Sequence, residues 1–289
     1  MAVLVRHDCG PHGSVNRAAA CVTVASLASG IGGFDLGLQR AGMTIAWQCE
    51  IDPFCRQILA KHWPDVARYP DLTTLSGFEE APVDLVCAGF PCQSISVAGK
   101  QQGMHDHDRW LWPSIRRLVA RIRPRWVVLE NTPNLLAVND GNAFAQVLGD
   151  LCGLWYDCEW DLLSAQDVGA PHLRRRLFII GRLDESVRSA GTARPDLADT
   201  DDAGRQKQRG AESMGTQQRS TERRRFTSPR VLSGRIGGTW PPQPDVLPVV
   251  DGLSTGMDDT RRSQITALGN SIVPQIAEWI GRRIIECDR

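Results

Sequence analysis

The chain reads Val83-Asp-Leu-Val-Cys-Ala-Gly-Phe-Pro-Cys-Gln93, an apolar run that closes on glycine and proline. This pattern predicts a short buried strand at 83–88 followed by a turn. Cys92 would then lie just past the carboxyl end of a strand, where open α/β sheets place their functional sites. A thiolate is a nucleophile, but most single cysteines are small core residues, so Cys92 becomes a catalytic candidate only together with other segments.

The sequence on either side of this stretch alternates predicted strands and helices. Strands are predicted at 22–27, 44–49, 83–88, 126–130 and 177–181, and helices at 34–40, 53–62 and 112–122. Repeated strand–helix pairs imply an α/β fold with a mostly parallel sheet that is covered on both faces. The tail between residues 264 and 285 has apolar residues at helical spacing behind Pro274, and we expect this helix to pack back on the main domain; the residues are Ile276, Trp279, Ile280 and Ile284.

Composition limits the class of protein. The 289 residues suit one large domain, or a domain with a smaller one, and the formal net charge of zero means that nucleic-acid binding has to rest on local patches. The nine cysteines form no C-x-x-C pair, which favours reduced thiols in a cytosol over a disulfide framework or a zinc site. Residues 1–20 have no long apolar stretch, so they are predicted to be a loose leader and not a signal peptide. No later segment is long enough to span a membrane.

The character of the sequence changes at Arg182. Residues 182–238 are rich in Arg, Gln, Ser, Thr and Gly, and between residues 182 and 235 twelve lysines and arginines face eight acidic residues. Composition alone favours a solvated, partly disordered insertion. The apolar and proline residues that begin at Trp240 then indicate a return to order.

A glycine-rich turn, Ser29-Gly-Ile-Gly-Gly33, joins the first predicted strand to the first helix. Glycines at such a turn let the backbone approach a ligand closely, although a tight turn without a ligand is the alternative. Glu50 follows Gly30 by twenty residues, the offset of the acid that binds ribose hydroxyls in dinucleotide folds, and this favours the ligand site. Asp35 occupies the place of the third glycine in G-x-G-x-x-G. A nicotinamide cofactor is therefore disfavoured, and another nucleoside ligand fits better.

Two more segments carry candidate chemistry. Glu130, in Glu-Asn-Thr-Pro133, closes an apolar strand and would lie on the same sheet edge as Cys92. A carboxyl group there can protonate a substrate ring nitrogen, although a charged strand end usually just meets solvent. The run His172-Leu-Arg-Arg-Arg176 precedes another strand. Its guanidinium groups either form an ordinary basic loop or neutralise a carboxylate, a phosphate or a base carbonyl.

In this order and spacing, the segments together resemble the cytosine carbon-5 DNA methyltransferases. The matching motifs are S-G-I-G-G (29–33), C-E-I-D (49–52), G-F-P-C-Q (89–93), E-N-T (130–132), H-L-R-R-R (172–176) and L-G-N-S-I-V-P (268–274). The resemblance covers residues 22–181 and 268–285. It implies an α/β fold with a Rossmann-like, mostly parallel sheet, the fold of S-adenosylmethionine-dependent methyltransferases, and a small inserted target-recognition domain. The implied domains are a leader at 1–20, a catalytic domain at 21–181, a target-recognition region at 182–261 and a C-terminal segment at 262–289 that packs back.

The resemblance also implies S-adenosylmethionine as the cofactor and no metal. The expected cofactor contacts come from the glycine-rich turn, from the segments that follow the next strands, from the start of the helix at 112–122 and from the Asn-Ser pair near the C-terminus. The residues are Ala28, Ser29, Gly30, Ile31, Gly32, Gly33, Glu50, Ile51, Asp71, Leu72, Pro91, Leu111, Asn270 and Ser271. Ala28 stands where the family usually has Phe, which lowers the expected cofactor affinity. His172 and Thr132 replace the usual Gln and Val, and neither change removes a proposed catalytic group.

The implied reaction is methyl transfer to carbon 5 of a flipped-out cytosine in duplex DNA. Cys92 would add to ring carbon 6, Glu130 would protonate ring nitrogen 3, and Arg174 and Arg176 would hold the base and the catalytic loop. Residues 93–108 would form the loop that closes over DNA. Contacts to DNA are expected from Gln93, Ser94, Arg223, Arg224 and Arg225. The resemblance also implies a monomer in the cytoplasm of a bacterium or phage-infected host, associated with double-stranded DNA, and a cognate restriction endonuclease as a further partner.

Two other functions remain open at this point. One is methylation of a tRNA cytosine, since a branch of the family shares the Pro-Cys-Gln loop. The other is a catalytically inactive relic that binds cofactor or DNA, against which the intact Cys92, Glu130, Arg174 and Arg176 argue. A protein that binds NAD is a distant third.

Overall fold

The computed structural model describes residues 21–76, 81–90, 110–189 and 259–288. Its elements are, in chain order, β1 (Thr23–Leu27), α1 (Gly33–Arg40), β2 (Thr44–Cys49), α2 (Pro53–His62), β3 (Ala67–Tyr69), β4 (Leu85–Gly89), α3 (Trp112–Ile122), β5 (Trp126–Asn131), the 3-10 turns η2 (Pro133–Leu136) and η3 (Val138–Gly141), α4 (Asn142–Gly153), β6 (Tyr156–Ser164), the 3-10 turn η4 (Ala165–Val168), β7 (Arg175–Leu183), α5 (Glu185–Ser189), α6 (Asp259–Asn270) and α7 (Pro274–Cys287). In these ranges no helix is both long enough and apolar enough to cross a membrane.

The strands form one seven-stranded sheet in the order β3-β2-β1-β4-β5-β7-β6. The first five strands are parallel, while β7 runs antiparallel to both β5 and β6. The predicted α/β fold with a mostly parallel sheet is therefore confirmed. The chain builds outward from β1 in one direction and from β4 in the other, so the strand order reverses between these two neighbours. In open α/β sheets the crevice at the carboxyl ends of such strands is the usual ligand site.

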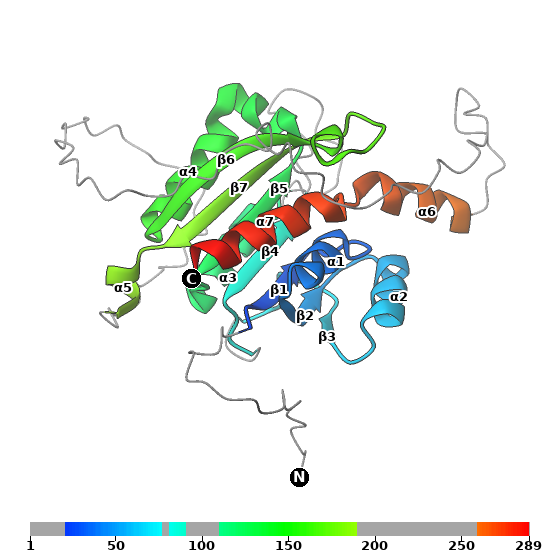
Figure 1. Cartoon of the computed structure of the whole chain (residues 1–289), viewed down its shortest axis with the longest axis horizontal. Coiled ribbons are helices and arrows are strands. Elements are labelled where there is room, and N and C mark those ends of the chain that lie inside the picture. The colour runs from blue at the N-terminus through cyan, green and yellow to red at the C-terminus, as the bar shows by residue number, and fades with distance from the viewer. Residues whose placement is uncertain (1–20, 77–80, 91–109, 190–258, 289) are drawn as a thin grey trace, which may run out of the picture.

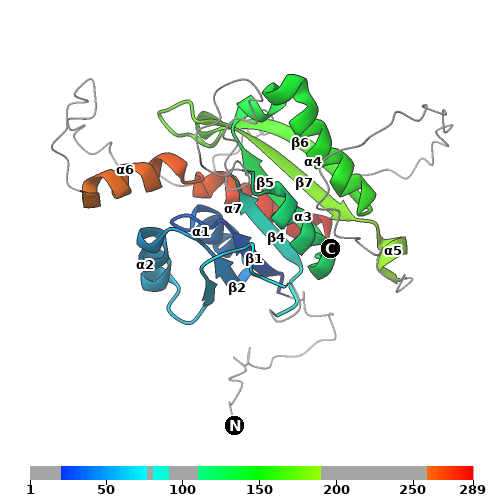
Figure 2. The ribbon, with the colours of Figure 1, turned by 180° about the vertical axis from the view of Figure 1, so that it is seen from behind.

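Helices cover both faces of the sheet. Figure 1 shows α1 and α7 on one face, and Figure 2 shows α3 and α4 on the opposite face. The two buried clusters follow this division, because Phe34 and Ile280 belong to one cluster and Ile115 and Val147 to the other. The apolar residues of α3 recur at spacings of three and four, which places them on one helix face, toward the sheet; they are Trp112, Ile115, Leu118 and Val119.

Helix α7 packs on α1, as its apolar spacing predicted. Two glycines make the approach close. A Cβ on Gly37 of α1 would overlap the backbone carbonyl of Pro274, and a Cβ on Gly281 of α7 would lie 2.8 Å from the Cβ of Ala41. The predicted C-terminal helical region divides into α6 and α7, which are separated by residues 271–273. Pro274 explains the break, since proline holds the preceding Val273 in an extended conformation (φ −74°, ψ 111°) and lacks an N–H.

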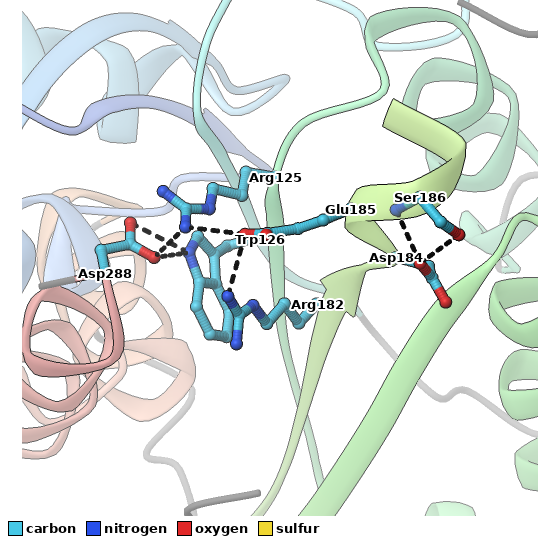
Figure 3. A network of polar contacts seen from close by, with 7 residues as sticks. All are labelled: Arg125, Trp126, Arg182, Asp184, Glu185, Ser186 and Asp288. Carbon is cyan, nitrogen blue, oxygen red and sulfur yellow. Dashed lines mark hydrogen bonds and ion pairs between the residues drawn. The ribbon is translucent and has the colours of Figure 1, made fainter. Parts of the chain in front are cut away.

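A polar network joins the chain's last helix to the sheet at the edge opposite the crevice (Figure 3). The indole N–H of Trp126 donates to Asp288, and Arg125 forms an ion pair with the same carboxylate at 3.0 Å. Glu185 pairs with both Arg125 and Arg182, and the Arg182 guanidinium lies 5.4 Å from the centre of the Trp126 ring. These contacts fix the start of β5, the end of β7 and the end of α7 together, so α7 is held at both of its ends.

Candidate active site

The candidate site lies at the carboxyl ends of β1, β2, β4 and β5. The turn after β1, residues 28–33, is called the glycine turn below. Gly30 adopts φ +56°, and a Cβ built on it would meet no atom of the described residues within 4 Å, so these residues leave the space above Gly30 open. The other glycines face protein, because a Cβ on Gly32 would come 2.5 Å from the ring of Trp63 and one on Gly33 would come 2.5 Å from the carbonyl oxygen of Ile272. Gly30 is therefore the position of the turn at which a ligand can approach the backbone.

Glu50 follows β2 directly and reaches across to the glycine turn. Its Oε2 accepts a hydrogen bond from the N–H of Gly30 at 2.7 Å, and its Oε1 accepts one from the N–H of Asp52 at 2.8 Å. Glu50 is buried, with 8% of its surface exposed, whereas the next residue, Ile51, is 71% exposed. Each carboxylate oxygen keeps a second lone pair, so the fixed carboxylate can still accept from ligand hydroxyls. An exposed apolar side chain beside it offers a surface for a ring.

Asp71 stands at the carboxyl end of β3, one strand further out. Its Oδ1 accepts hydrogen bonds from both the N–H and the hydroxyl of Thr73, each at 2.8 Å. The guanidinium of Arg117, on α3, donates to the carbonyl oxygens of Leu72 and Leu75 at 3.2 and 2.6 Å. The turn that carries Asp71 is thus held from the opposite layer of the fold. Sequence reasoning had not identified Arg117 in this role.

Asp35 does not face the candidate ligand site. It is fully buried in α1, where it accepts hydrogen bonds from the hydroxyl of Ser26 at 2.9 Å and the amide of Gln48 at 2.7 Å. Burial raises its pKa above the ordinary range of an aspartate, and the hydrogen bonds from Gln48 and Ser26 oppose that shift. Asp35 therefore connects α1 to Ser26 of β1 and Gln48 of β2.

Glu130 is the acid at the carboxyl ends of β4 and β5. It lies on β5 opposite Gly89 of β4 and is buried, with 7% of its surface exposed. Its Oε1 forms an ion pair with Nε of Arg176 at 3.0 Å. Burial raises the pKa of Glu130 to about 7, and the charges of Arg176 and Arg174 oppose this shift. A carboxyl group with a pKa near neutrality can both carry and release a proton under physiological conditions.

Asn131 ties the ends of β4 and β5 together. Its side-chain amide donates to the carbonyl oxygen of Phe90 at 2.9 Å, and its Oδ1 accepts from the N–H of Thr132 at 2.8 Å. The residue is buried, with 2% exposed. Phe90 immediately precedes Pro91 and Cys92 in the sequence, so Asn131 fixes the point at which that segment leaves the sheet. The motif E-N-T had drawn attention to Glu130 alone.

Arg174 has a different partner from Arg176. Its Nη2 donates to the carbonyl oxygen of Ser271 at 2.5 Å, between α6 and α7. Its Nε is buried and has no hydrogen-bond partner among the described residues. Burial and the charge of Arg176 lower the pKa of Arg174, while Glu130 raises it. The structure thus brings Glu130 and the two arginines to one place, as expected, but gives the arginines different contacts.

Several predicted site residues lie outside the described residues: Pro91, Cys92, Gln93, Ser94 and the rest of the loop to residue 108, together with Arg223, Arg224 and Arg225. Of the others, Ala28 adopts a left-handed conformation (φ 47°) in the glycine turn, and Ser29 donates from its hydroxyl to the carbonyl of Ser26. Leu111 precedes α3 and packs against the core cluster on that face. Asn270 ends α6 and is exposed.

Comparison with known proteins agrees with the sequence motifs. The sequence profile described as C-5 cytosine-specific DNA methylase matches residues 22–228 of the chain. The type II methyltransferase M2.BsuMI of Bacillus subtilis (strain 168) is 34% identical over an alignment of 182 residues that covers 60% of this chain and 46% of that protein. The type II methyltransferase M.HhaI of Haemophilus parahaemolyticus is 31% identical over 154 residues, which are 53% of this chain and 47% of that protein. The chain spans about half the length of these curated relatives.

The fold has a similar counterpart among solved structures. An Escherichia coli prophage protein, described provisionally as a DNA modification methyltransferase, superposes with a TM-score of 0.50 and 28% identity. The match covers 58% of this chain and 48% of the prophage protein. The likeness to that protein therefore extends to the arrangement of the strands and helices.

Proposed function

Because the chain belongs to the C-5 cytosine-specific DNA methylase family, we propose that it transfers a methyl group from S-adenosylmethionine to carbon 5 of a cytosine in duplex DNA. The observation that carries the proposal is the buried pair of Glu130 and Arg176. It lies at the same sheet edge as the glycine turn and Glu50, and the neighbouring strand leads directly into Pro91 and Cys92.

The residues at the ends of β1, β2 and β3 suit S-adenosylmethionine. Open space at Gly30 admits a ligand to the backbone, and Glu50 offers fixed acceptors to ribose hydroxyls. Exposed Ile51 can lie against an adenine ring, and Asp71 can accept from its exocyclic amine. When bound, S-adenosylmethionine supplies an electrophilic methyl group on a sulfonium. These residues bind the nucleoside and orient it toward Glu130 at the ends of β4 and β5.

The residues around Glu130, at the ends of β4 and β5, suit activation of a flipped-out cytosine. The Cys92 thiolate forms a carbon–sulfur bond to ring carbon 6, while Glu130 transfers its proton to ring nitrogen 3. The electron pair gained by the ring makes carbon 5 nucleophilic. Carbon 5 would then form its bond to the methyl group as the methyl–sulfur bond breaks, with S-adenosylhomocysteine as the leaving group. Transfer of the carbon 5 proton to a base then returns an electron pair to the ring and expels the Cys92 thiolate, and the proton on ring nitrogen 3 returns to Glu130. The raised pKa of Glu130 suits this role, because the carboxyl group carries a proton near neutral pH.

We further propose that the region predicted at 182–261 recognises the target sequence, apart from Arg182 and Leu183, which still belong to β7, and that residues 262–289 complete the catalytic domain. The basic excess between residues 182 and 235 supports this role, with Arg223, Arg224 and Arg225 as phosphate contacts. Gln93 and Ser94 are proposed to contact the DNA around the flipped base. A monomer in the cytoplasm of a bacterium or phage-infected host, with a cognate restriction endonuclease as partner, completes the proposal.

Methylation in cells tests the proposed function. Bisulfite sequencing of DNA from cells that express the chain should reveal protected cytosines in one recurring sequence, and cells that express Cys92→Ser should show none. A competition assay in vitro with duplex DNA and tRNA separates the two nucleic-acid substrates. Methyl transfer to tRNA alone, or to neither polymer, would overturn the proposal.

Glu50→Ala should weaken cofactor binding by on the order of 1.5–3 kcal/mol, because a charged acceptor to the ribose hydroxyls is lost. Calorimetry with S-adenosylhomocysteine measures the change, and Asp65→Ala, which removes an exposed acid after α2, serves as the control. Titration with NAD should give no heat of binding. An unchanged affinity in Glu50→Ala would leave Glu50 with only its structural hydrogen bonds to Gly30 and Asp52.

A further inference from the structure

Arg174 and Arg176 belong to one segment, but their side chains contact different partners. Arg176 forms the ion pair with the buried Glu130, whereas Arg174 donates to the carbonyl oxygen of Ser271. The backbone of Arg174 is itself fixed, since its carbonyl oxygen accepts from the N–H of Ala165 at 3.2 Å. An arginine with an anchored backbone and a buried Nε is suited to hold a second segment in place.

The segment that Arg174 holds is the link between α6 and α7, residues 271–273, called the 271 link below. The N–H of Ser271 donates to the carbonyl of Leu268, and the hydroxyl of Ser271 donates to the carbonyl of Ile272. The carbonyl oxygen of Ser271 lies where the helical pattern is interrupted before Pro274, and a charged donor from Arg174 satisfies it.

The 271 link in turn packs against the glycine turn. The backbone of Ile272 lies so close to Gly33 that a Cβ there would come 2.5 Å from its carbonyl oxygen and 3.0 Å from its nitrogen. The side chain of Ile272 lies over Gly89, 3.2 Å from the place a Cβ would take. A displacement of Ser271 and Ile272 would therefore reach the backbone that approaches the cofactor as well as the end of β4.

We propose that Arg174 is a positioning residue for the cofactor site: it holds the 271 link, and with it Asn270 and Ser271, against the glycine turn. This inference rests on the proposed function. It gives the two arginines different roles. Arg176 acts on Glu130 and hence on the base, and Arg174 acts on cofactor binding through Ser271. It differs from the expectation that both arginines hold the base and the catalytic loop.

Calorimetric titration with S-adenosylhomocysteine in the absence of DNA tests whether Arg174, and not Arg176, supports cofactor binding. Arg174→Lys and Arg174→Met should each weaken binding by about tenfold or more, because a charge-assisted hydrogen bond to Ser271 is lost. Arg176→Lys should bind close to wild type, and Arg175→Lys, a change at the exposed residue between them, is the matched control. Melting curves of all variants show whether each one folds. If Arg174→Met fails to fold, the affinity of Arg174→Lys, which keeps the positive charge, tests the inference alone.

A second readout separates positioning from general structural damage. The methylation rate lost in Arg174→Lys should rise again at high cofactor concentration, a KM effect, whereas the loss in Arg176→Lys should persist at saturation, a kcat effect. Wild-type affinity in Arg174→Lys, or equal weakening in Arg174→Lys and Arg176→Lys, overturns the inference while the proposed function stands. Failure of the wild-type protein to bind S-adenosylhomocysteine overturns both.

Discussion

Replacing Cys92 by serine should abolish methyl transfer and leave cofactor affinity close to that of the wild type. A serine hydroxyl at neutral pH is a far weaker nucleophile than a thiolate, so the addition to ring carbon 6 fails while the nucleoside site is unaltered. The measurement is covalent trapping: a duplex that contains 5-fluorocytosine at the target position should form a stable adduct with the wild-type chain in the presence of cofactor. No adduct should form with the variant.

The other cysteines supply the control for this experiment. Burial raises the pKa of Cys55 and of Cys158 to about 12, and that of the fully buried Cys87 well above its usual range, so these thiols are poor nucleophiles. Cys152→Ser, a change at an exposed thiol on α4, should trap the fluorinated duplex like the wild type. An adduct that forms equally well with Cys92→Ser would assign the nucleophile to another residue.

The parallel half of the sheet was predictable because its strands are buried on both faces and read as apolar runs. The strands predicted at 22–27, 44–49 and 83–88 agree with β1, β2 and β4 to within two residues at each end. The exposed edge was not predictable in this way. In β6, acidic residues alternate with Cys and Trp, a period of two that is typical of a half-buried strand, but this run was not among the predicted strands; β6 pairs with β7 over nine residues. Strand β3 has only three residues, too few to leave a pattern.

The candidate site was predictable where a motif reports a local spacing. The twenty residues between Gly30 and Glu50 bring a strand-end acid to the glycine turn, and the hydrogen bond between them agrees with that prediction. Contacts between distant segments leave no such signal in one sequence. The bond from Asn131 to Phe90 spans 41 residues and that from Arg174 to Ser271 spans 97, and both depend on strand order and helix packing. In the sequence, Asp35 argues against a nicotinamide ligand, but its burial in a network with Ser26 and Gln48 follows only from the packing of α1.

Glu130→Gln should slow the single-turnover methylation rate by roughly 10²–10⁴-fold, because glutamine can hydrogen-bond to ring nitrogen 3 but cannot transfer a proton to it. The pH dependence should change as well. The pKa of Glu130 is about 7, so the fraction of enzyme that carries the required proton falls as the pH rises through neutrality. The wild-type rate should therefore show a descending limb near pH 7. Glu185→Gln, a change at a half-exposed glutamate that pairs with Arg125 and Arg182, is the control.

The same pKa makes a prediction about stability that does not require activity. Burial raises the folded-state pKa of Glu130 from 4.5 to about 7, so between these values the folded protein binds more protons than the unfolded chain. The contribution of this group to the free energy of unfolding is complete below about pH 4.5 and is lost as the pH rises to about 7, a decline on the order of 3 kcal/mol. Glu130→Gln cannot titrate, so its urea-unfolding free energy should decline less over this interval than that of the wild type or Glu185→Gln. Parallel declines in all three proteins would show that Glu130 titrates like an exposed glutamate, and the proton for ring nitrogen 3 would then have to come from another group.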